Sequence, residues 1–540
     1  MEPSAMEQQQ GNGKPSSRLP GLWPWLGLLL VLLSTAFIRF RLLDMPLERD
    51  EGEYAYAGQL LLQGIPPWKL AYNMKLPGTY VAYALGMAAF GQSPAGIHLT
   101  LLFANGLTII FVFLLGRELL GPGPGLAASA VYAVLSVSPA VMGMEAHANH
   151  FVVLFAVPGT LLLWKAVKGG RARAWFFSGL LHGIALTMMQ QAVCFCLFGW
   201  AVLLAQTVVA RPLFTRQFLK RSALFGCGMF LPLAGVCLYA AWAGVFSRFW
   251  FWTVTYASTY VTGVSWQDGW NNLCAYLQKK FVIYAGFSGL IAIGLLAAFR
   301  NGGQRSQPGN PSLFVWAFFL FSCLGASIGL YFREHYFILL LPALSILTGR
   351  SLIRLQGALA GWRRVAIVAP SLLFAVVLGW TVFFQRRLFF QLPADVVLRA
   401  IYPDEPFPLT PAIGRFIRGH SAPNATVAVI GSEPEVYFYS HRHSATGYIY
   451  TYGLMEAQPY ALKMQRQMIS EIESNRPEYL LWVGYPDSWN VRPASHRGIF
   501  AWFGRYAERF YEPVGAANGG TGGLDAGKLV LYKRNHVGSQ

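Results

Sequence analysis

The chain alternates long apolar runs with short polar or charged connections through its first 384 residues. A run of about 20 apolar residues is long enough to cross the hydrocarbon core of a bilayer as a helix. We predict eleven such helices, at about 21–38, 97–116, 124–142, 151–167, 174–190, 192–210, 222–242, 281–299, 312–330, 337–349 and 365–384. The pattern therefore predicts a polytopic α-helical membrane domain over residues 21–384.

The pattern changes from about residue 385, and the charged fraction rises from about 10% to about 19% in the last 156 residues. Short β-branched or aromatic runs predict strands at 426–430, 479–483 and 529–532, and amphipathic patterns predict helices at about 410–419 and 455–475. Residues 385–540 therefore predict a C-terminal α/β domain. Residues 1–20 are rich in Gln, Gly, Ser and Pro, and they predict a disordered tail.

Composition supports the membrane class, because 54% of the residues are hydrophobic and only 12% are charged. A soluble globular chain carries about 25% charged residues. The net charge of +18 would suggest a nucleic-acid partner in a soluble protein. Here, however, 17 basic and three acidic residues fall in one alternating set of loops and in the N-terminal tail, whereas the opposite loops hold nine basic and eight acidic residues.

Basic residues flank the cytoplasmic ends of membrane helices. The charge asymmetry therefore predicts a multi-pass protein of the inner (plasma) membrane with a cytoplasmic N-terminus, and it gives no reason to expect a nucleic-acid partner. An odd number of helices then places the C-terminal domain outside the cytoplasm, in the periplasm or its equivalent.

Acidic residues of the membrane part concentrate on the outer face. Eight of the eleven acids before residue 385 lie there: Asp44, Glu48, Asp50, Glu51, Glu53, Glu145, Asp268 and Glu334. None of the eleven lies in the middle of a predicted helix, where charges usually mark ion or proton pathways. This distribution favours a site at the outer membrane surface over a transport pathway.

The first outer loop, residues 39–96, holds the densest group of acids. We predict an amphipathic helix lying on the interface from Glu53 onward, with Asp50 and Glu51 just before its first turn, where the helix dipole stabilises carboxylates. Residues 77–91 are apolar but too short to span, and they predict a second interfacial or re-entrant helix. Lys75 then lies at the same surface, where it either snorkels or binds a lipid phosphate.

These residues resemble the first outer loop of the GT-C glycosyltransferases of families 39 and 83. That group includes protein O-mannosyltransferases, the lipid A aminoarabinose transferase and the galacturonosyltransferase-like enzymes. The resemblance rests on Asp50-Glu51-x-x-Tyr54-Ala55, Lys75-x-Pro77, Met144-Glu145 and Arg333-Glu334-His335-Tyr336-x5-Pro342. Leu76 departs from the family, which has proline at that position.

The resemblance implies an inverting enzyme that moves a sugar from a polyprenyl-phosphate donor to a lipid, glycan or protein acceptor in the cell envelope. Protein glycosylation and lipid A modification are the two kinds of role in this group. Asp50 matches the catalytic aspartate and would be the general base, with Glu51 orienting it or the acceptor. Lys75 and Arg333 would bind the donor phosphate. Four further residues could orient the substrate: Glu145, His335, Tyr336 and Tyr54.

No cofactor is expected, although a divalent metal is an alternative that stays open. His335, or the cluster of Glu145, His147, Asn149 and His150, could bind a metal, but the spacing matches no recognised motif. Aromatic residues of the outer loop 243–280 could stack on a sugar or line a path for the lipid, but such residues more often form an interfacial belt.

Two other classes of protein remain as alternatives. A multi-pass transporter or lipid flippase with an outer gating domain would require ionisable or broken-helix sites near the bilayer midplane and related repeats. A non-catalytic assembly factor would require the acids and the lysine of the first loop to be dispensable. The sequence shows neither midplane sites nor repeats.

Overall fold

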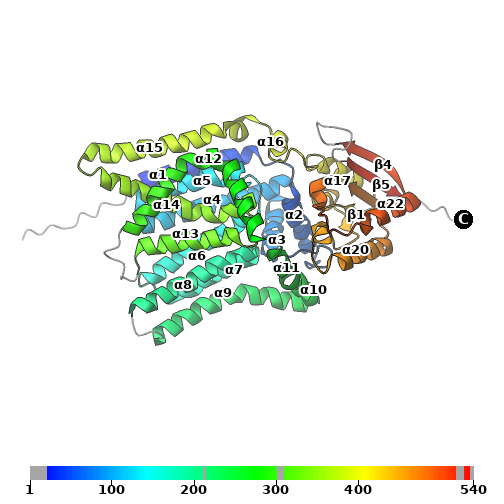
Figure 1. Cartoon of the computed structure of the whole chain (residues 1–540), viewed down its shortest axis with the longest axis horizontal. Coiled ribbons are helices and arrows are strands. Elements are labelled where there is room, and N and C mark those ends of the chain that lie inside the picture. Colours follow the sequence, from blue (N-terminus) through cyan, green and yellow to red (C-terminus); the bar gives the residue numbers. More distant parts are fainter. Residues whose placement is uncertain (1–20, 211–214, 301–308, 519–527, 536–540) are drawn as a thin grey trace, which may run out of the picture.

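The computed structural model describes residues 21–210, 215–300, 309–518 and 528–535. The tail predicted at residues 1–20 lies outside this range. Figure 1 shows a bundle of long helices at one end of the molecule and a small sheet with its helices at the other. Helices α2 and α3 lie between these two parts.

The helical part runs from residue 23 to residue 401. Its helices are α1 (Trp23–Arg41), α2 (Arg49–Leu62), α3 (Gly78–Phe90), α4 (Pro94–Leu120), α5 (Pro122–Ser136), η1 (Pro139–Val141), α6 (Ala148–Val167), α7 (Arg173–Met188), η2 (Gln190–Ala192), α8 (Val193–Ala210), α9 (Arg216–Trp242), α10 (Phe246–Trp250), η3 (Phe251–Tyr256), α11 (Ala257–Val261), α12 (Trp266–Arg300), α13 (Pro311–Ser327), η5 (Glu334–Leu340), α14 (Leu341–Ala358), α15 (Arg363–Phe384), η6 (Arg387–Gln391) and α16 (Ala394–Ile401). Each of the eleven predicted apolar ranges overlaps one of these helices.

Seven of the helical segments within the described residues are long and apolar enough to cross a membrane. They are Trp23–Arg41, Pro94–Leu120, Ala148–Val167, Arg216–Trp242, Trp266–Leu296, Glu334–Ala358 and Arg363–Phe384. The segments at α6 and α14 are mostly buried within the protein, whereas those at α12 and α15 are mostly exposed. The former make the centre of the bundle, and the latter present apolar side chains to lipid. The predicted fold class, a polytopic helical membrane protein with a C-terminal α/β domain, is thus confirmed.

The first outer loop differs from its prediction in two ways. Helix α2 begins at Arg49, four residues before the predicted start, so Asp50 and Glu51 lie inside its first turn instead of preceding it. The helix is also buried along most of its length, because α3 packs on it from the membrane side and the C-terminal domain covers it from outside. It is therefore a core helix at a junction and not an amphipathic helix on the membrane surface.

The C-terminal part is built on one mixed sheet. Its elements are α17 (Thr410–Gly419), β1 (Thr426–Ile430), α18 (Glu435–Ser440), β2 (His443–Ser444), α19 (Tyr452–Met455), α20 (Ala461–Asn475), β3 (Tyr479–Val483), α21 (Pro486–Trp489), α22 (Gly498–Phe510), β4 (Tyr511–Asn518) and β5 (Lys528–Arg534). The strand order is β2-β1-β3-β5-β4, with β1 parallel to β2 and β3 and with β5 antiparallel to both its neighbours.

The sheet brings two loops to the edge that faces the membrane part. Because β1 and β3 are parallel, the loops that follow them open at the same edge. Ser432 and Glu433 follow β1, and Ser488 follows β3. Ser488 Oγ accepts a hydrogen bond from Ser432 N and donates one to Glu433, and this edge contacts α2.

Candidate functional site

Local hydrogen bonds determine where α2 begins. Glu48 is the residue before the first turn, and its carboxylate accepts a hydrogen bond from the backbone N–H of Glu51 at 2.8 Å. The Glu51 carboxylate accepts one in return from the backbone N–H of Glu48 at 3.3 Å. This reciprocal pair is a capping box, which satisfies N–H groups that a helix start leaves without partners. It fixes Asp50 in the first turn.

Lys75 lies between two carboxylates of α2. Its Nζ donates to Asp50 Oδ1 at 2.9 Å and to Glu53 Oε2 at 2.8 Å. Asp50 and Glu53 are three residues apart, so they lie on one face of the helix. The same ammonium stands 4.4 Å from the centre of the Tyr54 ring, which adds a cation–π contact. A single ammonium thus compensates two carboxylates.

The pKa values of the two carboxyl groups shift in opposite directions. Burial by itself would raise the pKa of the Asp50 carboxyl, but the charge of Lys75 outweighs burial and holds that pKa well below its usual range. Burial dominates at Glu53 and raises its pKa despite the same lysine. A general base must be ionised before it can accept a proton. Asp50, whose pKa lies below its usual range, is the member of this pair that favours the ionised form.

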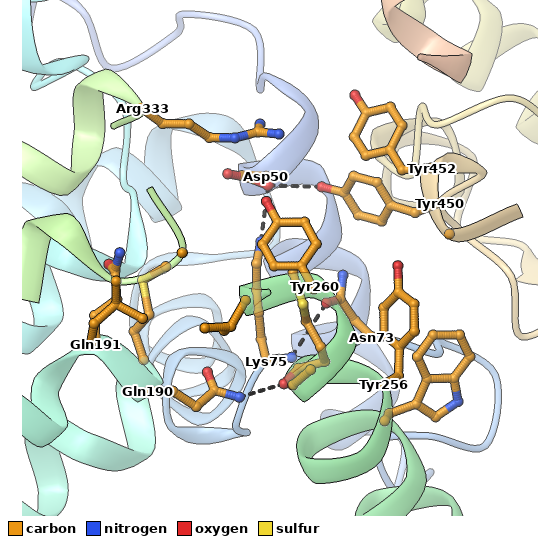
Figure 2. A pocket seen from close by; sticks show the side chains of 18 of the residues that line it. Asp50, Asn73, Lys75, Gln190, Gln191, Tyr256, Tyr260, Arg333, Tyr450 and Tyr452 are labelled. Atoms are coloured by element: carbon orange, nitrogen blue, oxygen red, sulfur yellow. Dashed lines mark hydrogen bonds and ion pairs between the residues drawn. The ribbon is translucent and has the colours of Figure 1, made fainter. Parts of the chain in front are cut away.

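Asp50 and Lys75 line a cavity of about 160 Å³ where the bundle meets the C-terminal domain (Figure 2). The cavity also brings together Arg333, His335 and Tyr336, three other residues singled out in the sequence. Five of the eight predicted site residues therefore share one cavity, although they come from three separate segments of the chain.

Arg333 is the cation of this cavity that has no carboxylate partner among the described residues. It precedes η5, is exposed to the cavity, and stands 5.8 Å from the Tyr331 ring centre. The neighbouring acid, Glu334, turns instead to Lys280 at 3.9 Å. The guanidinium is therefore available to an anion, whereas the Lys75 ammonium is already engaged by two acids.

Two histidines lie beside Asp50. The rings of His147 and His335 are stacked, with centres 4.3 Å apart and planes inclined by 18°, and His147 Nδ1 lies 3.7 Å from Asp50 Oδ2. The candidate ligand atoms of these three residues lie within 4.8 Å of one another, so the group could hold a metal ion. A metal binds in the plane of an imidazole ring, however, and two stacked rings direct their nitrogens side by side. The Lys75 ammonium already supplies a positive charge to the same carboxylate, and we therefore assign the local charge compensation to Lys75.

Three of the predicted residues do not reach the cavity. Glu51 is fully buried, and its Oε1 accepts from Ala146 N at 2.7 Å and contacts His98 Nε2 at 3.1 Å. The expectation that Glu51 could contact the acceptor therefore does not fit its place in the fold. Glu145 is fully buried too, without a hydrogen bond to its carboxylate, and burial together with the charge of Glu51 raises its pKa to about 8. Tyr54 does not line the cavity, and its ring contacts the Lys75 ammonium.

The C-terminal domain contributes residues that sequence reasoning missed. Tyr450, Tyr452 and Glu456 line the cavity, and the Tyr450 hydroxyl donates to Asp50 Oδ1 at 2.9 Å. These residues follow Asp50 by about 400 positions and lie in and beside the short helix α19, without a recognisable motif. The single sequence signal is their richness in tyrosine.

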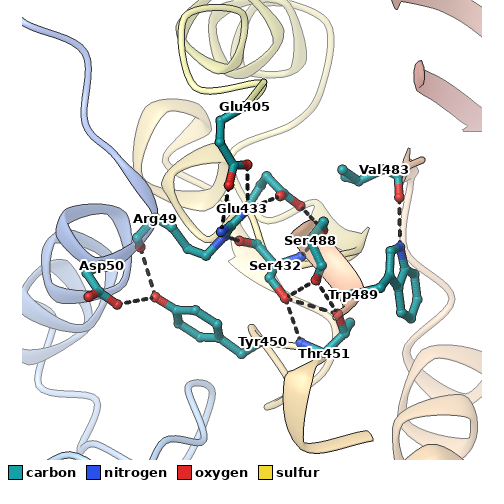
Figure 3. A network of polar contacts seen from close by, with 10 residues as sticks. All are labelled: Arg49, Asp50, Glu405, Ser432, Glu433, Tyr450, Thr451, Val483, Ser488 and Trp489. Carbon is teal, nitrogen blue, oxygen red and sulfur yellow. Dashed lines mark hydrogen bonds and ion pairs between the residues drawn. The ribbon is translucent and has the colours of Figure 1, made fainter. Parts of the chain in front are cut away.

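Arg49 joins α2 to the C-terminal domain (Figure 3). Its Nη2 forms ion pairs with Glu405 at 2.8 Å and Glu433 at 3.1 Å, and its Nε donates to the carbonyl of Ser432 at 2.7 Å. All three partners lie beyond residue 385. Because the guanidinium is largely buried, these bonds fix the domain against the helix that carries Asp50.

Aromatic residues of the outer segment 243–280 occupy two kinds of position, in the cavity lining and on the exposed surface. Trp252, Tyr256 and Tyr260 line the cavity, where flat rings can pack against a sugar or a lipid. Trp266 and Trp270 are exposed away from it, as expected for an interfacial belt. Residues 251–256 form a π-helix, a local irregularity that often marks functional sites.

Comparison with solved structures defines the class of protein. ArnT from Cupriavidus metallidurans bound to undecaprenyl phosphate matches with a TM-score of 0.58 and 14% identity, over 94% of this chain and 98% of that chain. The Archaeoglobus fulgidus oligosaccharyltransferase matches with a TM-score of 0.55 and 12% identity, over 97% of this chain and 76% of that chain. The chain has the GT-C fold, as the sequence predicts.

Sequence comparison agrees with this class. Residues 75–242 match the family model described as dolichyl-phosphate-mannose-protein mannosyltransferase. Two curated relatives, from Pseudomonas aeruginosa (strain UCBPP-PA14) and Pseudomonas paraeruginosa (strain DSM 24068 / PA7), are both named undecaprenyl phosphate-alpha-4-amino-4-deoxy-L-arabinose arabinosyl transferase. They are 28% and 26% identical to this chain over 218 and 284 residues. These matches span 38% and 49% of this chain and the same shares of the relatives.

Proposed function

We propose that this chain is an inverting glycosyltransferase that moves a sugar from a polyprenyl-phosphate donor to a lipid, glycan or protein acceptor. One observation carries the proposal: the Asp50 carboxyl and the Arg333 guanidinium, which has no carboxylate partner among the described residues, line the same cavity. The names of the curated relatives and the undecaprenyl phosphate bound to the ArnT neighbour support the donor class. None of the relatives and solved structures named above is a transporter.

The chemistry follows from these two charges. Asp50 accepts the proton of the acceptor hydroxyl as the acceptor oxygen attacks the anomeric carbon. The bond from that carbon to the phosphate oxygen breaks, and its electron pair stays on the phosphate. Arg333 offers a planar pair of donors to the phosphate as its charge develops. A single displacement of this kind inverts the anomeric configuration.

The cavity wall supports a lipid-linked donor. Met74, Met189, Val261 and Ile328 are apolar residues of the cavity lining, and the last three stand at the ends of α7, α11 and α13. An apolar wall at helix ends suits the first isoprene units of a polyprenyl chain. The C-terminal domain contributes Tyr450, Tyr452 and Glu456 to the lining, and we assign that polar side to the acceptor.

The proposal includes the sidedness predicted from the loops. The basic loops would face the cytoplasm of the cell, so the chain would sit in the inner (plasma) membrane with its N-terminus inside. The cavity and the C-terminal domain would then lie at the outer surface, where polyprenyl-phosphate sugars and envelope acceptors meet.

Comparison of cells with and without the chain tests the proposed function and shows whether the acceptor is a lipid, a glycan or a protein. Lipid, glycan and protein fractions are analysed by mass spectrometry for a sugar that depends on the chain. We expect one fraction to lose a glycosyl group when the gene is deleted and to regain it with the wild-type gene but not with Asp50→Asn. Equal rescue by both genes would argue against the proposed site.

Lys75 should matter for stability as well as for activity. Lys75→Met leaves Asp50 and Glu53 facing each other without a cation, and breaking a buried ion pair typically costs about 3–5 kcal/mol of unfolding free energy. We expect a lower midpoint of thermal unfolding for the purified protein. Lys69→Met, in the same loop but exposed, is the matched control and should leave the midpoint unchanged. Equal midpoints for the two variants would refute the structural role of Lys75.

Transfer should not need a divalent metal. Because Lys75 and Arg333 supply the positive charge of the cavity, protein treated with a chelator and then freed of it should keep its wild-type rate of sugar transfer. Loss of activity that returns on adding Mn²⁺ or Zn²⁺ would instead assign Asp50, His147 and His335 to a metal site.

A further inference from the structure

Asp50 receives both of its hydrogen bonds on the same oxygen. Lys75 Nζ donates to Oδ1 at 2.9 Å. The Tyr450 hydroxyl lies 2.9 Å from the same oxygen and 3.1 Å from the Arg49 carbonyl, and the shorter contact is the one with Asp50. Oδ2 lies 3.7 Å from His147 Nδ1, which is beyond hydrogen-bond distance. The Asp50 side chain is 21% exposed, so its carboxylate is open to the cavity.

Glu53 shares the same lysine but shows a different arrangement. Its Oε2 accepts from Lys75 at 2.8 Å and its Oε1 accepts from the Tyr80 hydroxyl, so each oxygen has one donor. The side chain has no exposed surface. Each of the two acids therefore has a tyrosine partner, but only the donors on Asp50 converge on one oxygen and leave the other for a ligand.

Tyr450 is held by the same network that holds Arg49. Thr451 N donates to Ser432 Oγ at 2.9 Å, and the Ser432 carbonyl accepts from Arg49 Nε at 2.7 Å. The contacts form a closed circuit, shown in Figure 3, that runs from Arg49 through Ser432 and Thr451 to Tyr450 and back to Asp50. Its two ends are neighbouring residues of α2, so the position of the Tyr450 hydroxyl is fixed relative to the helix.

We propose that Tyr450 is a positioning residue for the transfer reaction: its hydroxyl, with Lys75, holds Oδ1 of Asp50 so that Oδ2 faces the acceptor hydroxyl. The inference rests on the proposed function, in which Asp50 is the base. It gives the C-terminal domain a direct part in the chemistry. Docking of that domain through Arg49 completes the geometry of an acid carried by the membrane part.

The test is Tyr450→Phe in the full-length purified protein. Losing one hydrogen bond to a charged group should lower kcat by about 10-fold. The donor KM should change by less than about two-fold, because the phosphate is bound elsewhere. The hydrogen bond favours the ionised carboxylate, so its loss raises the pKa of Asp50 and moves the acidic limb of the kcat/KM profile to higher pH.

The other titratable groups around Asp50 stay in place in this variant. They are Lys75, Arg333, His147, His335, Glu48 and Glu53. Tyr439→Phe is the matched control, because the Tyr439 hydroxyl also crosses between the two parts, to Leu47 N at 2.8 Å, but does not touch Asp50. It should lower thermal stability without changing kcat or the pH profile.

If Tyr450→Phe does not fold, a second variant that keeps the hydroxyl still tests the inference. Tyrosine fluorinated at ring position 3 is nearly the same size but a stronger donor, so at position 450 it should move the acidic limb to lower pH. The inference is overturned if both Tyr450 variants keep the wild-type kcat and the wild-type acidic limb of the pH profile while Asp50→Asn is inactive. That result would leave the proposed function intact. Activity in Asp50→Asn would instead overturn the proposed function.

Discussion

Replacing Asp50 with asparagine is expected to lower kcat by about 10²- to 10⁴-fold, the usual contribution of a general base. Asparagine keeps the shape of the side chain and can still accept a hydrogen bond from Lys75, but its amide cannot take a proton at neutral pH. Donor affinity should change little, because Arg333 is untouched. The measurement is the initial rate of sugar transfer by protein purified in detergent or in lipid discs.

The control for this prediction separates loss of chemistry from loss of fold. Asp44→Asn removes an exposed acid of the same outer loop and should keep the wild-type rate. Both variants should elute as the wild type does in size-exclusion chromatography. An Asp50→Asn variant with more than about a tenth of the wild-type kcat would exclude Asp50 as the base, because general bases contribute far more than that.

The second large effect is expected at Arg333. Arg333→Ala removes the one cavity cation that has no carboxylate partner among the described residues, and it should weaken binding of the polyprenyl-phosphate donor by about 10- to 100-fold, as expected for hydrogen bonds to a charged group. Arg333→Lys keeps the charge but loses the planar pair of donors. Its affinity for the donor should therefore lie between that of the wild type and that of Arg333→Ala. Donor titration of the purified protein, followed by quenching of tryptophan fluorescence, measures the effect.

Arg399→Ala is the matched control, since Arg399 is exposed on α16 at a site the cavity does not include. Its donor affinity should equal that of the wild type. If Arg333→Ala bound donor normally while Lys75→Met did not, the phosphate would have to be reassigned to Lys75. That outcome would require the ion pairs of Lys75 with Asp50 and Glu53 to open when donor binds.

Long-range periodicity made much of the architecture predictable. Bilayer thickness sets the length of apolar runs, so the positions of the spanning helices could be found from hydropathy alone. Strands β1 and β3 and the centre of β5 (residues 529–532) are short runs of β-branched or apolar residues and were also predicted. Strand β4 was missed, because Pro513 and Gly515 interrupt its pattern and a bulge lies between them.

The start of α2 was misplaced for a different reason. Its first turn holds Glu48, Arg49, Asp50 and Glu51, and a scan for amphipathic periodicity treats these charges as a loop. Glutamate is also not among the residues preferred at the position before a helix. The buried contacts that make these charges stable, from Lys75, His98 and the C-terminal domain, come from distant segments that no local pattern reveals.

The roles of the cations could not be separated in the sequence. Nothing in the sequence favours either Lys75 or Arg333 as the phosphate-binding residue. In the structure Lys75 is already paired with two carboxylates, whereas Arg333 has no carboxylate partner among the described residues. The contribution of Tyr450 to the site could not be predicted from the sequence either. Its contact with Asp50 depends on how the loops after β1 and β3 meet the first turn of α2, which is a property of the tertiary fold.

The most direct test of the central proposal is turnover by the purified wild-type protein in lipid discs. The protein is incubated with polyprenyl-phosphate sugars and with candidate lipid, glycan and protein acceptors, and mass spectrometry follows donor and product. We expect one donor to be converted to free polyprenyl phosphate with equimolar glycosylation of an acceptor and inversion at the anomeric carbon. Intact donors in every mixture, with a protein that is folded and lipid-bound, would contradict the account.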